Sequence, residues 1–492
     1  MNSAAAKPHR RIRLLAAVGL VVILGSAAVG SVAVATLRTA RAGAATTSGP
    51  SDATTAAPSD TPIPTPSDTP IPTPSDTPTT APPSPSTSPT SKPAPGVHEY
   101  FVANGTEPAT AADPFHPGVV AVASENITWH SVTSGCSRPA VRFSRDNGAT
   151  WGAASFPWSW QCQDIHAVLA WGPNGRLWAG NAVGSGSGVA MSMTYSDDFG
   201  KSWSKRYLEH FNPPWVGCFP AITVDDWPNS PNYGTVYVAY NWLRDKYGPG
   251  VSLMASKDGS NWVHTEVPLD PGTAAYPYAW RIGYRIKAAP DGTAVVSFYQ
   301  ATLKYWSTVH IFDEGSGSNI GRRGYETSLV HFDGKKLTAD RPLWAADVDH
   351  DTARWQSGLA VDDAGHAWLA VETRGKVRLG QVGGAWRDIS VPGKYSFKPS
   401  VAVSGRTIFV GWHARDNSGH VWTYYTLSYD GGETFLPPAL VNKAWWSLRV
   451  ANNAAMNGVG LRENADFANG MIYYTYGDYR SGTGVYMAQI RP

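Results

Sequence analysis

The chain has 492 residues, of which 42% are hydrophobic, 16% are charged and 12% are aromatic, and its 40 Lys and Arg residues nearly balance 38 Asp and Glu residues. This balance excludes the strongly basic face that nucleic-acid binding requires, and three cysteines exclude a disulfide-dense scaffold. The 21 Trp, 22 Tyr and 49 Gly residues favour many short strands and tight turns, because aromatic residues fill pleated surfaces and glycine supplies turn conformations.

Residues 1–45 predict an export segment. Basic residues precede an uncharged apolar run from Leu14 to Leu37. This run exceeds the apolar core of about 7–15 residues in a cleaved signal and approaches the roughly 20 residues that span a bilayer. Basic residues before such a run stay in the cytoplasm. The rest of the chain is therefore expected outside the cell, either secreted after cleavage near Ala40–Ala42 or tethered to the membrane by the uncleaved segment.

Residues 46–96 are rich in Pro, Thr and Ser, and the octad SDTPIPTP begins at Ser59 and again at Ser67. A segment with so little to bury is expected to form an extended, polyproline-like spacer. At about 3.1 Å per residue its reach is on the order of 150 Å. It either holds the following domain away from a cell surface or is a linker of no special length.

Residues 97–492 contain a repeated pattern, Ser-x-Asp-x-Gly-x-[Ser/Thr]-aromatic. Full copies begin at Ser144, Ser196 and Ser428, and a copy one residue shorter begins at Ser256. Ser and Asp side chains bond to the backbone of their own turn, Gly takes a positive φ, and the aromatic residue packs into the sheet edge. We therefore interpret the pattern as a folding device and not as a catalytic motif.

The spacing of these copies corresponds to units of about 57 residues, a period typical of propellers and arrays. Seven pairs of strands follow the same order, with openings that run from Pro108 to Val459. The apolar stretch 98–103 can complete the last unit and close the ring, which removes edge strands. The expected fold is an all-β, seven-bladed propeller with four-stranded antiparallel blades, closed by the N- and C-terminal strands. Six blades with an irregular insert are the alternative.

With this pattern, residues 97–492 resemble the Asp-box (bacterial neuraminidase repeat) propellers of the sialidase superfamily. The resemblance implies a propeller that is a glycosidase, a polysaccharide lyase or a non-enzymatic receptor. Sialidases of this superfamily carry an Arg triad, a Tyr–Glu pair, an Asp acid/base and a Phe/Tyr-Arg-Ile-Pro motif. Here Tyr284 and Arg285 begin a similar tetrapeptide, but Lys287 replaces the proline and the motif lies in the fourth unit. The same residues also fit an ordinary strand opening.

In a propeller, the starts of inner strands and the ends of second strands share one face, the mouth, and the Asp-containing turns lie on the other. Glycoside hydrolysis needs two carboxyl groups or a Tyr–Glu pair, and guanidinium groups bind carboxylates in bidentate fashion. The candidate catalytic residues at the mouth are Glu372, Asp164, Arg285 and Arg354. The candidate substrate-binding residues are His166, Tyr284, Trp355, His413, Asp478 and Arg480.

Two of these candidates, Asp164 and His166, lie two residues apart on a predicted strand, so they are expected to point to the same side and could transfer protons together. Each candidate also has a structural interpretation, such as an ion pair between Arg480 and Asp478.

Export permits a disulfide. We favour Cys136–Cys162, because a loop and the opening of the next blade can be neighbours, and Cys162–Cys218 is the alternative. No His, Cys and Asp residues have metal-binding spacing, and no cofactor is expected.

The sequence thus predicts an exported, monomeric, sialidase-like glycoside hydrolase that acts on an extracellular, acidic glycan or glycoconjugate. The alternatives are a non-catalytic propeller that binds glycans or proteins, and a polysaccharide lyase. The membrane is involved only through the N-terminal segment.

Overall fold

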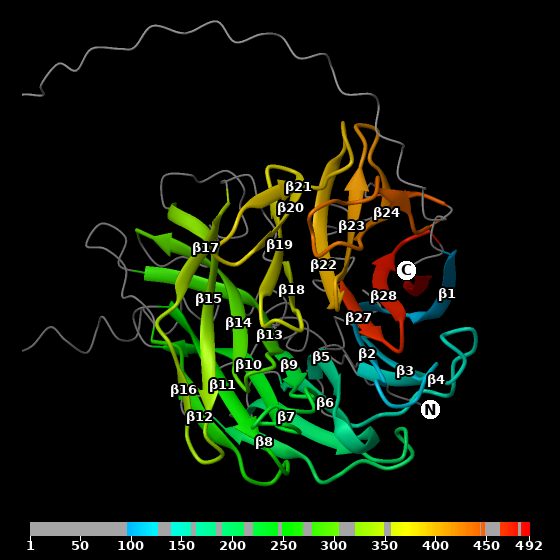
Figure 1. Cartoon of the computed structure of the whole chain (residues 1–492). Helices are drawn as coiled ribbons and strands as arrows, with labels where there is room; N and C mark the ends of the chain where they lie inside the picture. Colours follow the sequence, from blue (N-terminus) through cyan, green and yellow to red (C-terminus); the bar gives the residue numbers. More distant parts are fainter. Residues whose placement is uncertain are drawn as a thin grey trace, which may run out of the picture. The chain divides into compact units, whose positions relative to one another are not determined.

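The protein was analysed as a computed structural model that describes residues 96–125, 139–158, 164–183, 189–210, 220–244, 248–268, 278–304, 320–348, 356–442, 444–447, 463–480 and 484–492. These residues form seven antiparallel sheets that follow one another around a common axis as the blades of a propeller (Figure 1). The predicted seven-bladed, all-β fold is confirmed. The export segment and spacer predicted for residues 1–95 lie outside the described residues.

The blades are numbered in chain order, and within each one the first strand lies nearest the axis. Blade 1 consists of β2 (Thr106–Ala112), β3 (Val120–Glu125) and β4 (Pro139–Ser144). Blade 2 consists of β5 (Asp164–Trp171), β6 (Leu177–Val183), β7 (Val189–Ser196) and β8 (Tyr207–His210). Blade 3 consists of β9 (Ala221–Val224), β10 (Val236–Arg244), β11 (Gly248–Ser256) and β12 (Val263–Glu266). A 3-10 turn, η1 (Pro173–Gly175), joins β5 to β6.

Blades 4 to 7 continue the same order. Blade 4 consists of β13 (Tyr278–Ala288), β14 (Ala294–Leu303), β15 (Ile320–Phe332), β16 (Leu337–Ala339) and β17 (Leu343–Asp347), and blade 5 of β18 (Ser357–Val361), β19 (Ala367–Thr373), β20 (Lys376–Gln381) and β21 (Trp386–Asp388). Blade 6 consists of β22 (Tyr395–Ser404), β23 (Thr407–Arg415), β24 (His420–Ser428), β25 (Ala439–Leu440) and β26 (Trp446–Ser447). Blade 7 consists of β27 (Asn464–Ala468), β28 (Met471–Asp478), β29 (Gly484–Arg491) and, from the start of the domain, β1 (Gly96–Asn104).

The ring is closed by strands from the two ends of the domain. The first strand, β1, pairs antiparallel with the last strand, β29, from Gly96 opposite Arg491 to Asn104 opposite Gly484. This pairing confirms the closing strand that we predicted at 98–103. The inner strand of blade 7 starts at Asn464, later than the opening predicted at Val459, which lies outside the described residues.

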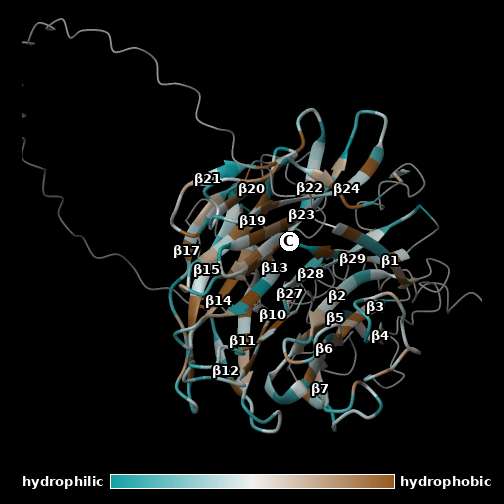
Figure 2. Cartoon of the chain, turned by 45° about the vertical axis from the view of Figure 1, so that its right-hand side comes forward, coloured by the Kyte–Doolittle hydropathy of each residue, from teal (hydrophilic) through white to brown (hydrophobic). Residues whose placement is uncertain are grey.

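Seven hydrophobic clusters hold the blades together, one in each gap between neighbours. The cluster between blades 3 and 4, for example, contains Tyr237 and Tyr284, both fully buried. Hydrophobic residues lie along the strands, and hydrophilic residues are concentrated at the turns (Figure 2). Successive side chains along a strand point into the gaps on opposite sides of the blade, so each strand contributes to two hydrophobic clusters.

The four Ser-x-Asp-x-Gly turns have the chemistry expected from the sequence. In the turn after β24, Ser428 Oγ donates to Asp430 Oδ1 at 2.7 Å, and the backbone N–H groups of Gly432 and Thr434 donate to these two side chains at 2.8 and 2.9 Å. Gly432 has φ of 88°, and a Cβ there would lie 2.5 Å from the Trp368 ring of the preceding blade. The glycine is therefore required both by the turn and by close packing between blades.

These hydrogen bonds also keep the Asp side chains of the turns ionised. Bonds from neighbouring hydroxyl and backbone groups lower the pKa of Asp198 to about 2 and hold the pKa of Asp430 far below its usual range. Such groups are anions at neutral pH and do not donate protons. Because the third strand of each blade runs away from the mouth, the turns that follow it lie on the opposite face, as predicted.

Among the described residues, no helix is long and apolar enough to cross a membrane.

Asp430→Ala should lower the free energy of unfolding by about 1 kcal/mol, because it removes charge-assisted hydrogen bonds in a turn that is only half-buried. The folded-state pKa lies below the unfolded value of about 4, so this contribution is complete above that pH and is lost as the pH falls below it. Thermal unfolding measures the loss. Glu433→Ala, an exposed carboxylate in the same turn, is the control; an equal loss in both variants would contradict the role given to Asp430.

Candidate functional site

Four inner strands carry the same irregularity where they start at the mouth. A β-bulge interrupts the register of β2, β5, β13 and β22, and the extra residue is in the left-handed region at Glu107 (φ 53°), His166 (φ 56°), Gly283 (φ 72°) and Lys398 (φ 55°). A side chain in this region costs roughly 1–2 kcal/mol, which Gly283 avoids. Observed strain of this kind is frequent at functional sites. The bulges place three ionisable side chains at the mouth.

The bulge at His166 changes the partner that the sequence predicts for it. Because the backbone turns left-handed, the simple alternation from Asp164 is broken, and His166 Nε2 lies 3.4 Å from Glu107 Oε2 of the preceding blade. The His166 backbone N–H donates to Glu125 Oε1. His166 thus pairs with Glu107, and the side chain of Asp164 lies outside the described residues. Glu107 occupies the same strand position as His166, which is the sequence signal for this pair.

Glu372, the predicted catalytic carboxylate, ends β19 and is fully buried. Its Oε1 accepts a hydrogen bond of 2.8 Å from the hydroxyl group of Tyr395, which begins the inner strand of the next blade and is half-buried. Tyr395 is not among the candidates predicted from sequence. Its position at the start of an inner strand was the available signal, but the contact with Glu372 depends on how blades 5 and 6 pack.

Arg285 and Glu372, from neighbouring blades, both act on the buried Tyr325. Burial raises the pKa of Tyr325 well above its usual range, the charge of Glu372 raises it further, and Arg285 lowers it. Both charges therefore act on one hydroxyl group, which donates to the backbone oxygen of Gln356 at 3.1 Å. Blades 4 and 5 thus bring a cation and a carboxylate to one sector of the ring.

Two predicted substrate-binding residues, His413 and Tyr284, are fully buried. His413 Nε2 lies 3.1 Å from Glu463 Oε1, and its Nδ1 lies 3.1 Å from Thr423 Oγ1. The hydroxyl group of Tyr284 donates to the backbone oxygen of Arg281 at 2.9 Å. Both side chains therefore bind other parts of the protein. His413 can influence a ligand only through Glu463, which lines the axial cavity.

Asp478 and Arg480, also predicted to bind substrate, form an ion-pair network with the first strand. Arg480 Nη1 donates to Glu99 Oε2 at 2.8 Å, its Nε lies 2.7 Å from Asp478 Oδ2, and its guanidinium carbon lies 3.9 Å from the centre of the Tyr486 ring. Burial raises the pKa of Asp478 to about 7, while Arg480 lowers it. The ion pair between Arg480 and Asp478 that we considered from sequence is present, and Glu99 extends it across the ring closure.

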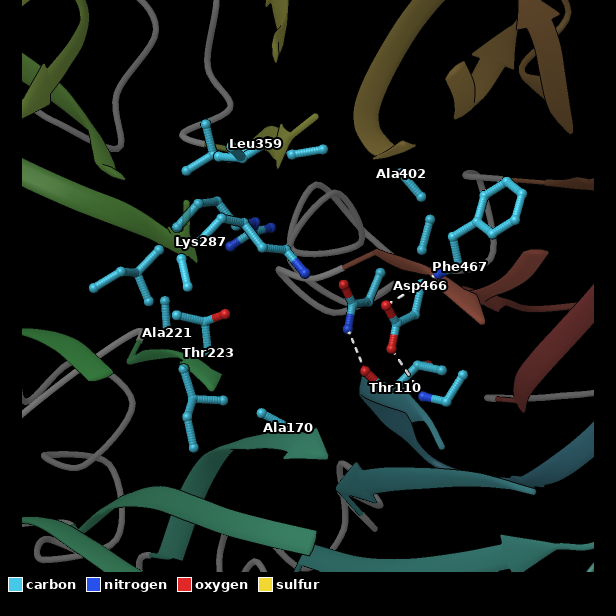
Figure 3. A pocket seen from close by; sticks show the side chains of 18 of the residues that line it. Thr110, Ala170, Ala221, Thr223, Lys287, Leu359, Ala402, Asp466 and Phe467 are labelled. Carbon is cyan, nitrogen blue, oxygen red and sulfur yellow. Dashed lines mark hydrogen bonds between the residues drawn. The ribbon is translucent and has the colours of Figure 1, made fainter. Parts of the chain in front are cut away.

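An axial channel runs between the seven inner strands and has a volume of about 400 Å³. Lys287 projects into it from blade 4 toward Asp466 of blade 7 (Figure 3). Neither residue is among the site candidates predicted from sequence. Other inner strands have small residues at the corresponding positions, so a charged residue at either position could have been noticed in the sequence. That the two side chains lie close together, however, follows only from the closed ring.

Several predicted residues lie outside the described residues. These are Arg354, Trp355, Cys136, Cys162 and Cys218, so the Arg partner of Arg285 and both disulfide alternatives remain predictions. Within the ranges that the structure describes, no group of three or more His, Cys, Asp or Glu residues is arranged to hold a metal ion.

No family model and no curated protein matches the chain. Among solved structures, an ulvan lyase has a TM-score of 0.49 and 14% identity, with 79% of this chain and 94% of that chain covered. An α-L-arabinanase from Penicillium chrysogenum has a TM-score of 0.43 and 14% identity, with 65% and 94% covered, and a Hadza microbial sialidase has a TM-score of 0.41 and 12% identity, with 72% of each chain covered. The chain is thus a β-propeller structurally similar to these proteins at low sequence identity.

Arg480→Gln should destabilise the propeller by about 3 kcal/mol, because it leaves the buried carboxylate of Asp478 and the half-buried carboxylate of Glu99 without their cation. Burial already raises the folded-state pKa of Asp478 to about 7, well above its unfolded value of about 4, and loss of the guanidinium group raises it further. The loss should therefore grow as the pH rises through about 7, where the carboxyl group of the unaltered protein ionises. Thermal unfolding on both sides of about pH 7 measures it, with Arg491→Gln at the exposed end of β29 as control. An unchanged midpoint would mean that the network does not hold the ring.

Proposed function

We propose that the propeller is an extracellular, sialidase-like glycoside hydrolase that acts on an acidic glycan at its mouth. The hydrogen bond between Tyr395 and the buried carboxylate of Glu372 is the main support, because a Tyr–Glu pair is one of the arrangements by which glycosidases attack the sugar. Arg285 acts on Tyr325 together with Glu372 and lines the axial cavity, and its guanidinium group can hold the carboxylate of an acidic sugar. The sequence resemblance to sialidases supports the same reaction, and the predicted export segment supports an extracellular site.

In this reaction the Tyr395 oxygen forms a bond to the anomeric carbon, and its proton passes to Glu372. The bond from the anomeric carbon to the leaving oxygen breaks, and that oxygen takes a proton from a second carboxyl group, for which Asp164 is the residue chosen from sequence. The oxygen of a water molecule then bonds to the anomeric carbon while one proton of that water returns to the second carboxyl group. The bond between sugar and tyrosine breaks, and the tyrosine oxygen takes back its proton from Glu372. The buried position of Glu372 favours proton acceptance from the tyrosine, because little water competes for the carboxylate.

A non-catalytic propeller that binds glycans is the second candidate. His413, Tyr284, Asp478 and Arg480 all have protein partners, and this arrangement supports a rigid binding surface as well as an active site.

Glu372→Gln and Tyr395→Phe should each lower kcat on the substrate by about 10²–10⁴-fold, because each removes one half of the group that attacks the sugar. The full-length protein should be assayed on sialosides and on glycans that contain uronic acids, with release of free sugar as the hydrolase signal and an unsaturated sugar as the lyase signal. Glu433→Gln and Tyr233→Phe, exposed residues on the opposite face, are the matched controls.

Binding of a glycan without turnover, unaffected by Glu372→Gln, would reject the hydrolase and favour the non-catalytic propeller. An unsaturated product would assign a lyase.

A further inference from the structure

The axial channel is a second candidate site, separate from the Tyr395–Glu372 pair. It is lined by inner strands of all seven blades and has the volume of a small-molecule pocket. Small residues of other inner strands line the channel around Lys287 and Asp466 (Figure 3). They include Thr110, Ala170, Thr223 and Ala402. They leave space around the two charged side chains.

The charges in this space do not cancel. Asp466 is fixed by backbone N–H groups, since Ala112 donates to its Oδ2 at 2.8 Å and Phe467 to its Oδ1 at 3.0 Å. The surrounding channel wall raises the pKa of Asp226, although the side chain is open to solvent on one side; Lys287 lowers that pKa and Asp466 raises it. Lys287 acts on both carboxylates without an ion pair to either one among the described residues. One ammonium group thus faces two carboxylates.

The whole lining has the same excess of acid. Two cationic and four acidic side chains line the channel: Arg285 and Lys287, against Asp226, Asp363, Glu463 and Asp466. Glu463 is paired with His413, and the other three carboxyl groups still outnumber the two cations. A ligand that carries a carboxylate would add to this excess, whereas a single positive charge would reduce it. The described residues offer no cluster of three metal-ligating side chains, so an ammonium group fits this charge better than a metal ion.

The end of the channel opposite the mouth is suited to a sugar ring. Trp227 and Phe467 line it, and the Trp227 ring is held by a hydrogen bond of 3.1 Å from its Nε1 to the backbone oxygen of Ala288. Aromatic faces of this kind pack against sugar rings without chemistry. Asp226 is exposed at the same end, so the channel can be entered without passing the mouth.

We propose that the axial channel binds a small amino sugar, with its ammonium group between Asp226 and Asp466 and its ring against the aromatic side chains at the end opposite the mouth. This site does not depend on the proposed hydrolase reaction. Lys287 is a built-in competitor for the same carboxylates, so its removal strengthens binding, whereas removal of a carboxylate weakens it.

Calorimetric titration of the full-length protein with D-glucosamine near neutral pH tests the site. We expect binding that is about tenfold weaker in Asp466→Asn, because a charge-assisted contact is lost, and tighter in Lys287→Met. Asp333→Asn, an exposed turn residue, is the control and should bind like the unaltered protein. Binding should also weaken as the pH falls, because the pKa values of Asp226 and Asp466 are both raised and protonation removes the charges that hold the ammonium group.

D-glucose, N-acetyl-D-glucosamine, D-glucuronate and calcium chloride are the comparison ligands, and each lacks either the ammonium group or the sugar. No binding of glucosamine, equal binding of glucose, preference for glucuronate or calcium, or weaker binding in Lys287→Met would overturn the proposal. If Asp466→Asn does not fold, Asp226→Asn and Lys287→Met give the same test with opposite signs. Glu372→Gln should leave glucosamine binding unchanged, which separates this site from the hydrolase proposal.

Discussion

The pairing of β1 with β29 is the constraint on which the rest of the structure depends. It joins strands from the two ends of the domain, Gly96–Asn104 and Gly484–Arg491, and so turns seven stacked sheets into a closed ring. Closure removes the free edges that an open stack would expose. The loss of chain entropy is offset by backbone hydrogen bonds and by Arg480, which binds Glu99 of the first strand and Asp478 of the blade it completes. Polar groups that looked like mouth residues in the sequence therefore hold the ring.

Closure also determines what the centre can contain. Each inner strand has neighbours on both sides, so its side chains alternate between two hydrophobic gaps, and only positions near the axis are free to carry charge. At the mouth, bulges at Glu107, His166 and Lys398 interrupt this alternation and bring ionisable groups inward. Deeper in the channel, Lys287 and Asp466 face each other from blades that are distant in sequence. One scaffold thus presents two different polar sites along a single axis.

The architecture was predictable from sequence because short sequence patterns determine it. The Ser-x-Asp-x-Gly turns mark the blades, the seven strand pairs give their number, and the apolar stretch at 98–103 identifies the closing strand. The placement of Glu372 at the mouth followed from its position at a strand end. The contacts were harder to predict. The partner of His166 depends on a left-handed residue that breaks the period of two, and the hydrogen bond from Tyr395 to Glu372 depends on packing between blades. No local pattern carries that information.

Hydrogen exchange on a chain that lacks residues 1–104 tests the central claim, the closure of the ring, most directly. A chain that lacks only residues 1–95 is the matched control, because it keeps β1. Since each blade is held by both neighbours, the account predicts that loss of β1 lowers amide protection in all seven blades together. Loss of protection confined to β28 and β29, with blades 2 to 5 protected as in the control, would contradict it.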